Sequence, residues 1–261
     1  MILSVCMATH NGASYLTHQI ESIVAQLDAD AELVVVDDAS SDDTVRILLG
    51  FRDYRIRIMQ NERKHGVVNT FARALAKARG DIIFLCDQDD VWHPTKVAAT
   101  LEAFSSTPPP TLILSNGRVI DGQGRDTGKA LFERQPPLGF FPNLVQNRYQ
   151  GCVIAFRREL LDLVLPFPKD IPMHDSWIGV VNALVGRPAY LPDKLVGYRR
   201  HDRNVTTARH GPVGRMASQR WALVKALLSR ARTLAGVRKA HHEQVRLSVY
   251  SGSTPKAGRC N

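Results

Sequence analysis

The first hundred residues alternate between short apolar runs and amphipathic stretches, and this alternation limits the folds open to the chain. The apolar runs have the length of buried strands, and the stretches between them repeat apolar residues at helical spacing. Predicted strands cover residues 2–8, 32–36, 55–60 and 81–86. Predicted helices cover residues 14–27, 40–49 (of which 40–43 offer the N-cap) and 69–79. Strands that alternate with helices predict right-handed βαβ units and an α/β fold around a parallel sheet.

Polar residues follow three of these predicted strands at the point where each one ends. They form the segments Thr9-His10-Asn11-Gly12, Asp37-Asp38 and Asp87-Gln88-Asp89-Asp90. Ligands of open parallel sheets bind beyond the carboxyl ends of the strands, so these segments predict a site at that edge. The sequence contains neither G-x-G-x-x-G after the first strand nor G-x-x-x-x-G-K-[ST], the usual dinucleotide and triphosphate fingerprints.

Three carboxylates stand within four positions directly after the buried run 81–86. Carboxylates this close repel one another, and their burial is costly unless something pairs them. In an extended segment Asp87 and Asp89 point the same way, so both can bind one hard divalent cation through oxygen. The alternative is a solvated turn in which Asp90 caps the next helix.

The second half of the chain is less regular. The sequence predicts strands at 111–115 and 151–156, a turn at 121–124, and helices at 158–165 and 174–185. Residues 133–150 are rich in Pro, Asn and Gln and are predicted as a loop. We divide the chain into residues 1–205, with halves at 1–105 and 106–205, and a basic helical segment at 206–261.

The formal net charge of +9 is concentrated at the C-terminal end. Residues 199–261 contain 14 Lys and Arg against 2 Asp and Glu, whereas residues 1–198 contain 20 against 23. This asymmetry predicts an anionic partner for the end of the chain.

No apolar run reaches the roughly 20 residues of a membrane helix, and residues 1–8 read as a strand and not a signal peptide. The four cysteines form no C-x-x-C pair. A cytoplasmic location with reduced thiols is therefore expected.

Seven motifs in order resemble those of glycosyltransferase family 2, which has the GT-A nucleotide-sugar fold. They are Ala8-Thr9-His10-Asn11-Gly12, Val35-Val36-Asp37-Asp38-Ala39-Ser40-Ser41-Asp42-Asp43-Thr44, Gly66-Val67-Val68-Asn69, Asp87-Gln88-Asp89-Asp90-Val91-Trp92, Gly151-Cys152, His174-Asp175-Ser176-Trp177 and Tyr198-Arg199-Arg200-His201-Asp202-Arg203-Asn204. The last three resemble bacterial rhamnosyltransferase-like members in particular. His10 departs from the pattern, since Tyr is usual there.

The resemblance implies a donor site for a nucleotide-diphosphate sugar. Thr9, Asn11 and Asp38 would bind the nucleotide, and Asp87 and Asp89 would hold Mg²⁺ or Mn²⁺, with Asp89 as the direct ligand. The cation would bridge the diphosphate and stabilise the leaving nucleotide. His201 would contact the diphosphate or complete the metal shell, and its alternative is a plain surface residue.

The resemblance also implies an acceptor site. Asp175 would be the general base of an inverting displacement, although as the first acidic residue of an apolar helix it could equally be an N-cap. Trp177 would stack on a sugar or else belong to the core. His174 would support Asp175, and Gly151 and Cys152 would meet a backbone requirement at the acceptor side, without a reactive thiol.

The implied function is sugar transfer from a UDP- or dTDP-linked donor, rhamnose among the candidates, to a saccharide or lipid-linked acceptor in bacterial surface polysaccharide biosynthesis. A basic amphipathic helix predicted at 213–237 would bring residues 213–247 to an anionic membrane at the inner face, or pack on the body. A sugar nucleotidyltransferase is the second reading, but Thr9 to Tyr15 lacks the basic residue of a triphosphate loop. A nucleic-acid-binding protein is the third; it leaves the aspartates unexplained, and no nucleic-acid partner is expected.

Overall fold

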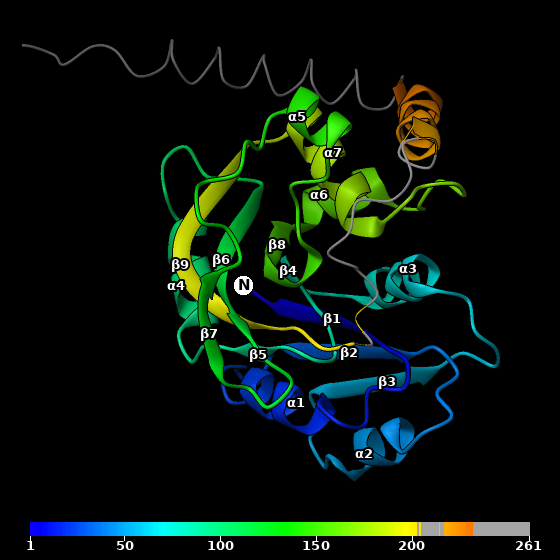
Figure 1. The fold of residues 1–261 in the computed structure, drawn as a ribbon, viewed down its shortest axis with the longest axis vertical. Helices are drawn as coiled ribbons and strands as arrows, with labels where there is room; N and C mark the ends of the chain where they lie inside the picture. Colours follow the sequence, from blue (N-terminus) through cyan, green and yellow to red (C-terminus); the bar gives the residue numbers. More distant parts are fainter. Residues whose placement is uncertain (203, 205–213, 215–216, 232–261) are drawn as a thin grey trace, which may run out of the picture.

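A computed structural model describes residues 1–202, 204, 214 and 217–231, and it is built on one mixed sheet of nine strands (Figure 1). The strands are β1 (Leu3–Thr9), β2 (Glu32–Asp37), β3 (Ile56–Gln60), β4 (Ile82–Cys86), β5 (Val91–Trp92), β6 (Leu112–Ile120), β7 (Asp126–Ala130), β8 (Ile154–Arg157) and β9 (Pro188–Arg199). Their order is β3-β2-β1-β4-β8-β6-β9-β5, with β7 paired to β6.

Helices pack on both sides of this sheet (Figure 1). They are α1 (Leu16–Val24), α2 (Thr44–Gly50), α3 (Val67–Lys77), α4 (Lys96–Phe104), α5 (Phe140–Val145), α6 (Arg158–Val164) and α7 (His174–Val185), with a short 3₁₀ turn η1 (Gly151–Val153). A further helix covers residues 217–231. None of the helices in the described ranges is long and apolar enough to cross a bilayer.

The N-terminal half confirms the parallel βαβ arrangement. Strands β1 to β4 are parallel; β1, β2 and β4 are apolar and buried, whereas β3 lies at the sheet edge and is half-buried. The pairing sets Thr9 beside Asp37, and Met7 beside Cys86. The three polar segments that follow these strands therefore meet at one edge of the sheet.

We expected a Rossmann-like, mostly parallel central sheet, and the sheet is instead mixed, because several strands of the second half are antiparallel to their neighbours. β8 runs antiparallel between β4 and β6, and β5 runs antiparallel to β9. β6 continues to Ile120, beyond the predicted end at 115, and the predicted turn at 121–124 joins it to β7 as a hairpin. In that turn Gly124 has a φ of +82° and its N–H donates to the Asp121 carbonyl. A tight turn allows only antiparallel neighbours, whereas parallel ones need a long crossover.

Three further segments differ from the prediction. The stretch 133–150 contains α5, whose Pro142 lies in the first turn, where a missing N–H costs nothing. The predicted strand 151–156 begins as the 3₁₀ turn η1 and becomes β8 only at Ile154. β9 was not predicted, because Pro192, Asp193 and Lys194 interrupt its apolar pattern. These three residues are exposed, and the pairing with β6 shifts register near them.

Candidate active site

One cavity of about 430 Å³ lies where the carboxyl ends of β1, β2 and β4 face the start of α7. Its walls come from both halves of the chain: Ala8, Thr9, His10, Asp38, Lys64, Val67, Thr70, Phe71, Asp87, Gln88, Asp89, Gln150, Gly151, Met173, His174, Asp175, Tyr198 and Asn204. The structure thus brings eight of the predicted site residues into or beside one space, namely Thr9, Asp38, Asp87, Asp89, His174, Asp175, Gly151 and, through its bond to Asp89, His201.

Asp38 is buried at the side of the cavity formed by β1 and β2. Its carboxylate accepts hydrogen bonds of 2.8 Å each from the backbone N–H groups of His65 and Gly66 and from the Asn61 side chain. Burial by itself raises the pKa of Asp38, but these hydrogen bonds outweigh it and hold the pKa below its usual value. Asp38 is therefore an anion that also fixes the loop before α3, where Gly66 has a φ of +84°.

Thr9 and Asn11 have different positions. Thr9 lines the cavity and donates to Asp37 Oδ1 at 2.9 Å. Asn11 lies outside the cavity, with a φ of 50°, and its Oδ1 accepts from the Ser41 N–H at 2.8 Å. The prediction that Asn11 binds the nucleotide is not supported, because its side chain joins the loop after β1 to the loop after β2.

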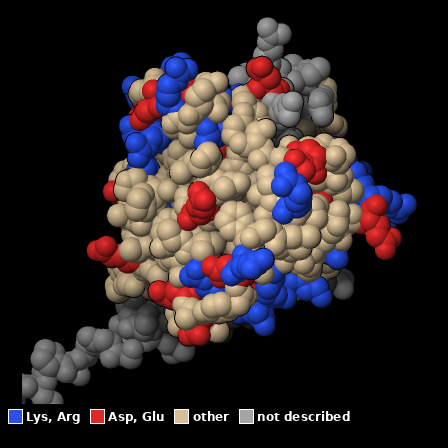
Figure 2. Space-filling view, turned by 90° about the horizontal axis from the view of Figure 1, so that it is seen from below, with Lys and Arg blue, Asp and Glu red and all other residues tan. Residues whose placement is uncertain are grey.

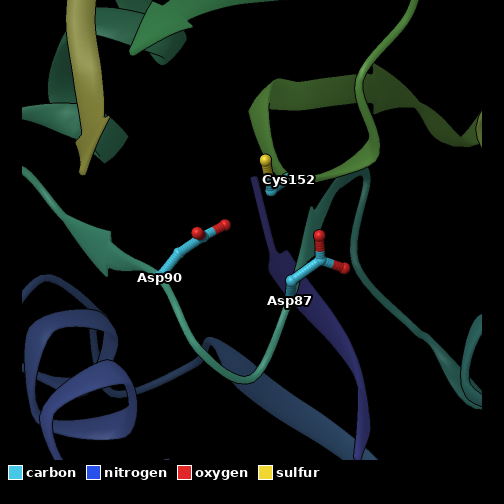
Figure 3. A group of neighbouring side chains, drawn as sticks. All are labelled: Asp87, Asp90 and Cys152. Carbon is cyan, nitrogen blue, oxygen red and sulfur yellow. The ribbon is translucent and has the colours of Figure 1, made fainter. Parts of the chain in front are cut away.

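Three carboxyl groups and one thiol gather at the end of β4. The side-chain ligand atoms of Asp87, Asp90 and Cys152 all lie within 4.8 Å of one another, and Figure 3 shows them around one small space. Asp90 is buried, and its Oδ2 has no hydrogen-bond partner. Burial, with the charges of Asp90 and Asp89, raises the pKa of Asp87 well above its usual value, and burial with the charge of Asp89 raises that of Asp90 to about 7.

Asp89 is held by residues that follow β9. His201 Nε2 lies 2.8 Å from Asp89 Oδ2, and Asn204 Nδ2 donates to the same oxygen at 3.1 Å. The His201 ring stacks on Tyr15 with centroids 4.7 Å apart. His201 is thus not a plain surface residue in the structure, since it orients the predicted metal ligand.

The acidic group fits a hard divalent cation. Its donors are mostly carboxylate oxygens, which Mg²⁺ and Mn²⁺ prefer. The unpartnered Oδ2 of Asp90 and the negative charges around Asp87 destabilise the folded protein unless a positive charge is near. A bound cation would supply that charge. Asp87 and Asp89, both on the cavity wall, are the residues that would hold the cation, and Asp90 is positioned to assist them.

Arg199 at the end of β9 holds the acidic segment in place. Its backbone N–H donates to Asp90 Oδ1 at 2.9 Å, and its guanidinium donates to the Asp89 carbonyl at 2.7 Å. The same guanidinium reaches the carbonyls of Asp121 and Gly122 and lies over the Tyr15 ring. Arg199 is itself buried, and the carbonyl oxygens and the Tyr15 ring take the place of water around its guanidinium.

We predict that Arg199→Met lowers the free energy of unfolding by about 2–4 kcal/mol, because several buried carbonyl oxygens lose their donor. The measurement is denaturant unfolding. Arg46→Met is the control, since the Arg46–Asp43 ion pair is exposed and its loss should leave the free energy of unfolding nearly unchanged. Equal stability of the two variants would contradict the role of Arg199.

Asp175 lies in the first turn of α7, where it is buried and lines the same cavity. Its carboxylate accepts from the N–H groups of Ser176 (2.6 Å) and Gly151 (3.2 Å) and from Asn147 Nδ2 (3.1 Å). Burial raises the pKa of Asp175 to about 6, although these hydrogen bonds oppose the shift. A role as a helix cap does not explain why the carboxylate lines a cavity. A carboxylate with a raised pKa is suited to proton transfer near neutral pH.

His174 does not support Asp175 as predicted. Both of its ring nitrogens are buried and lack a hydrogen-bond partner, and the ring stacks on Phe71 with centroids 4.0 Å apart. Burial lowers the pKa of His174 to about 3, so the ring is neutral. A Cβ on Gly151 would lie 3.2 Å from His174 Nε2, so the glycine leaves room beside this nitrogen.

Two other acceptor-side predictions need correction. Trp177 is fully buried and its indole N–H donates to the Val164 carbonyl at 3.0 Å, so it belongs to the core and cannot stack on a sugar. Cys152 does not line the cavity but joins the acidic group behind it. Burial raises the pKa of the Cys152 thiol well above its usual value, in line with the prediction that it is not a reactive thiol.

Three contributors were not predicted: Arg199, Phe71 and Asn147. Arg199 and Asp89 are 110 residues apart in sequence, so only the fold brings them together. Phe71 reads as an ordinary core residue of an amphipathic helix. Asp90 was counted among the three clustered carboxylates, with a helix cap as its alternative role, but it was not named as a metal ligand.

Comparison with known protein families identifies one that matches most of the chain. The model of the family described as Glycosyl transferase family 2 matches residues 4–163. The chain belongs to this family. Glycosyltransferase alr2836 of Nostoc sp. strain PCC 7120, itself uncharacterized, is 29% identical over 217 residues, which are 78% of this chain and 66% of the relative. The glucosyltransferase WfgD of Escherichia coli, named for UDP-Glc and α-D-GlcNAc-diphosphoundecaprenol, is 35% identical over 96 residues, 37% of this chain and 38% of the relative.

Solved structures share the GT-A fold of this family 2 glycosyltransferase chain. Residues 1–349 of S. aureus TarS in complex with UDP-GlcNAc superimpose with a TM-score of 0.67 at 20% identity, over 91% of this chain and 71% of that one. The mannosyltransferase PcManGT of Pyrobaculum calidifontis, in complex with GDP-Man and Mn²⁺, superimposes with a TM-score of 0.59 at 20% identity. The match covers 97% of this chain and 76% of that one. The chain spans 66% of alr2836 and 59% of a mycobacterial relative, Rv1520.

Proposed function

We propose that this family 2 chain is an inverting, metal-dependent glycosyltransferase. It transfers a sugar from a nucleotide-diphosphate donor to a saccharide or lipid-linked acceptor in bacterial polysaccharide biosynthesis. The observation that carries the proposal is that Asp87, Asp89 and the buried carboxylate of Asp175 line a single cavity. In a one-step displacement the leaving group and the attacking hydroxyl are held in the same space.

The wall formed by β1, β2 and β4 takes the donor. Asp38 and Thr9 offer an anionic and a hydroxyl partner for the base and ribose, and Lys64, whose Nζ lies 2.9 Å from His10 Nε2, adds a cation at the cavity. Asp87 and Asp89 would hold a divalent cation, which would supply positive charge to stabilise the leaving nucleotide. His201 and Asn204 keep the Asp89 carboxylate oriented for this task.

The wall formed by η1 and α7 takes the acceptor. Asp175, fixed by Ser176, Gly151 and Asn147, removes the proton of the attacking hydroxyl. That oxygen then displaces the nucleotide at the anomeric carbon, and a single displacement inverts its configuration. The neutral His174 ring hydrogen-bonds the acceptor in the space that Gly151 leaves open, which gives its buried nitrogens a partner.

Relatives support a nucleotide-sugar donor but differ in the sugar. WfgD is named for a UDP-sugar and a lipid-diphosphate acceptor, TarS binds UDP-GlcNAc, and PcManGT binds GDP-Man with Mn²⁺. We propose a UDP- or dTDP-linked donor, with rhamnose among the candidate sugars because the motifs around Gly151, His174 and Tyr198 resemble rhamnosyltransferase-like members.

Calorimetric titration of UDP, dTDP and GDP in the presence and absence of Mn²⁺ tests the donor site. We expect one of the uridine or thymidine diphosphates to bind only with Mn²⁺, and Asp38→Ala to weaken this binding by roughly 10–100-fold, since a charge-assisted hydrogen bond is lost and the loop at His65 is released. Asp43→Ala is the control, because Asp43 is exposed and outside the cavity. Unchanged affinity of Asp38→Ala would refute the nucleotide contact.

The pH dependence of transfer follows from Asp175. The group acts as a base only when ionised, so kcat/KM is full above the pKa of about 6 and falls as the pH decreases through it, tenfold for each further unit. The neighbouring titratable groups are His174, which burial keeps neutral, and Asp87. A pH–rate profile that stays flat between pH 7 and about pH 5 would contradict this assignment.

A further inference from the structure

Half of the exposed large apolar side chains among the described residues lie on two helices, α5 and the helix 217–231. These are four of the eight such side chains: Phe141 (76% exposed), Val145 (70%), Trp221 (59%) and Leu228 (68%). We call these four residues the α5 surface. Figure 1 shows α5, α6, α7 and the orange helix 217–231 at the same end of the molecule.

Hydrogen bonds join the helix 217–231 to α5 and to the segment after α6. Arg220 Nε donates to the Val145 carbonyl at 2.7 Å, and Arg230 donates to the Pro166 carbonyl at 2.5 Å. Leu223 and Ala226 are buried, so one face of the helix 217–231 packs on the body. Trp221, Lys225 and Leu228 are spaced by four and three residues, and all three are exposed. The outward stripe of this helix is therefore partly apolar, which packing on the body does not explain.

All charged side chains of the helix 217–231 are basic. Residues 217–231 contain Arg220, Lys225 and Arg230 and no Asp or Glu. Lys225 Nζ lies 5.7 Å from the centre of the Trp221 ring, so a cation and an aromatic ring occupy one spot. At the opposite end of the molecule, seen in Figure 2, basic and acidic side chains are interspersed. Exposed Trp, aliphatic side chains and unbalanced cations together match the headgroup region of an anionic bilayer.

We propose that the α5 surface docks the protein on an anionic lipid bilayer, with Phe141, Trp221 and Leu228 entering the headgroup boundary and Lys225 meeting lipid phosphate. The aliphatic side chains favour lipid over nucleic acid, whose backbone offers them nothing apolar. The surface also leads to the acceptor wall of the cavity, because Asn147, two residues after Val145, donates to Asp175 Oδ1. A bilayer at this surface lies on the acceptor side, where a lipid-linked hydroxyl would arrive; this last point rests on the proposed function.

The test is binding of the full chain to vesicles, without any substrate. The vesicles contain phosphatidylcholine and phosphatidylglycerol in equal parts, with pure phosphatidylcholine as the comparison. Trp221 is the natural reporter, since the other two tryptophans, Trp92 and Trp177, are buried. We expect co-sedimentation that weakens with salt, and a blue shift of the tryptophan emission on anionic vesicles.

Two variants locate the contact. Phe141→Ser combined with Trp221→Ser should weaken co-sedimentation at least about tenfold, and Lys225→Glu should weaken it on anionic vesicles only. Leu49→Ser is the matched control, because Leu49 is exposed on α2, away from α5, and its loss should change nothing. Nucleotide binding and thermal midpoints like those of the unsubstituted chain show that the variants are folded.

Several results would overturn the proposal. Failure to bind anionic vesicles, or binding without a blue shift, excludes insertion of Trp221. Vesicle binding that survives the double substitution assigns membrane contact to another part of the chain. Binding to duplex DNA in place of vesicles, at the same salt concentration, assigns the surface to nucleic acid. None of these results depends on whether the chain transfers a sugar, so the surface and the catalytic proposal fail separately.

Discussion

Asp175→Asn is expected to slow sugar transfer by roughly 10²–10⁴-fold, the range for loss of a general base. Asn has the size of Asp but cannot take the proton of the acceptor hydroxyl. Donor and Mn²⁺ affinity should stay within about threefold of the original, because Asp175 belongs to α7, whereas Asp38 and Asp89 follow β2 and β4. The measurements are transfer rate, donor affinity by calorimetry and thermal midpoint.

The alternative role of Asp175 predicts a different outcome. An N-cap would tolerate the change, because Asn caps a helix about as well as Asp, and transfer would remain nearly normal. Ser176→Ala is a suitable control, since its backbone N–H still donates to Asp175 and its hydroxyl has no partner. Near-normal transfer by Asp175→Asn, or a product that retains the donor's anomeric configuration, would rule out the assigned displacement.

Asp89→Ala is expected to reduce metal-dependent nucleotide binding by more than about 100-fold, and excess EDTA should abolish transfer by the unsubstituted chain. The substitution removes the carboxylate that His201 and Asn204 orient toward the site. Mn²⁺ affinity, measured by calorimetry or by the paramagnetic relaxation of water, separates loss of the cation from loss of the nucleotide.

The control for Asp89 is Asp126→Ala, which removes an exposed carboxylate that is paired only loosely with Arg118 at 3.8 Å. It should leave Mn²⁺ and nucleotide affinity unchanged. Full activity in EDTA, or Asp89→Ala with ordinary Mn²⁺ affinity, would show that the acidic segment has another purpose.

The N-terminal half of the fold was predictable because its signals are local. Buried parallel strands are continuous apolar runs, and the helices between them have clear periodicity, so β1 to β4 and α1 to α3 appear in the sequence. β9 could not be found in this way, since Pro192 and the polar residues beside it interrupt the pattern. The direction of β8 depends on its pairing with β4 and β6, which no local pattern specifies.

The site divides in the same manner. Carboxylates at strand ends were recognisable from position, and the structure places Asp38, Asp87, Asp89 and Asp175 around one cavity. The sequence could not reveal which of these side chains are exposed to the cavity, nor which residues far away in the chain they contact. Trp177 and Asn11 look like ligand residues in their motifs, yet one is enclosed by the core and the other joins two loops. The predicted membrane segment 213–247 is described only at residues 214 and 217–231, and there it packs on the body while exposing an apolar stripe.

The central claim is that the cavity binds a nucleotide-diphosphate sugar and releases its nucleotide with the help of a divalent cation. The most direct test measures nucleoside diphosphate released from a panel of UDP-, dTDP- and GDP-sugars, with Mn²⁺ and with EDTA. The account predicts release from at least one UDP- or dTDP-sugar with Mn²⁺ and none with EDTA. Release that is equal in EDTA, or no release from any sugar nucleotide together with pyrophosphate formation from a nucleoside triphosphate and a sugar phosphate, would contradict it.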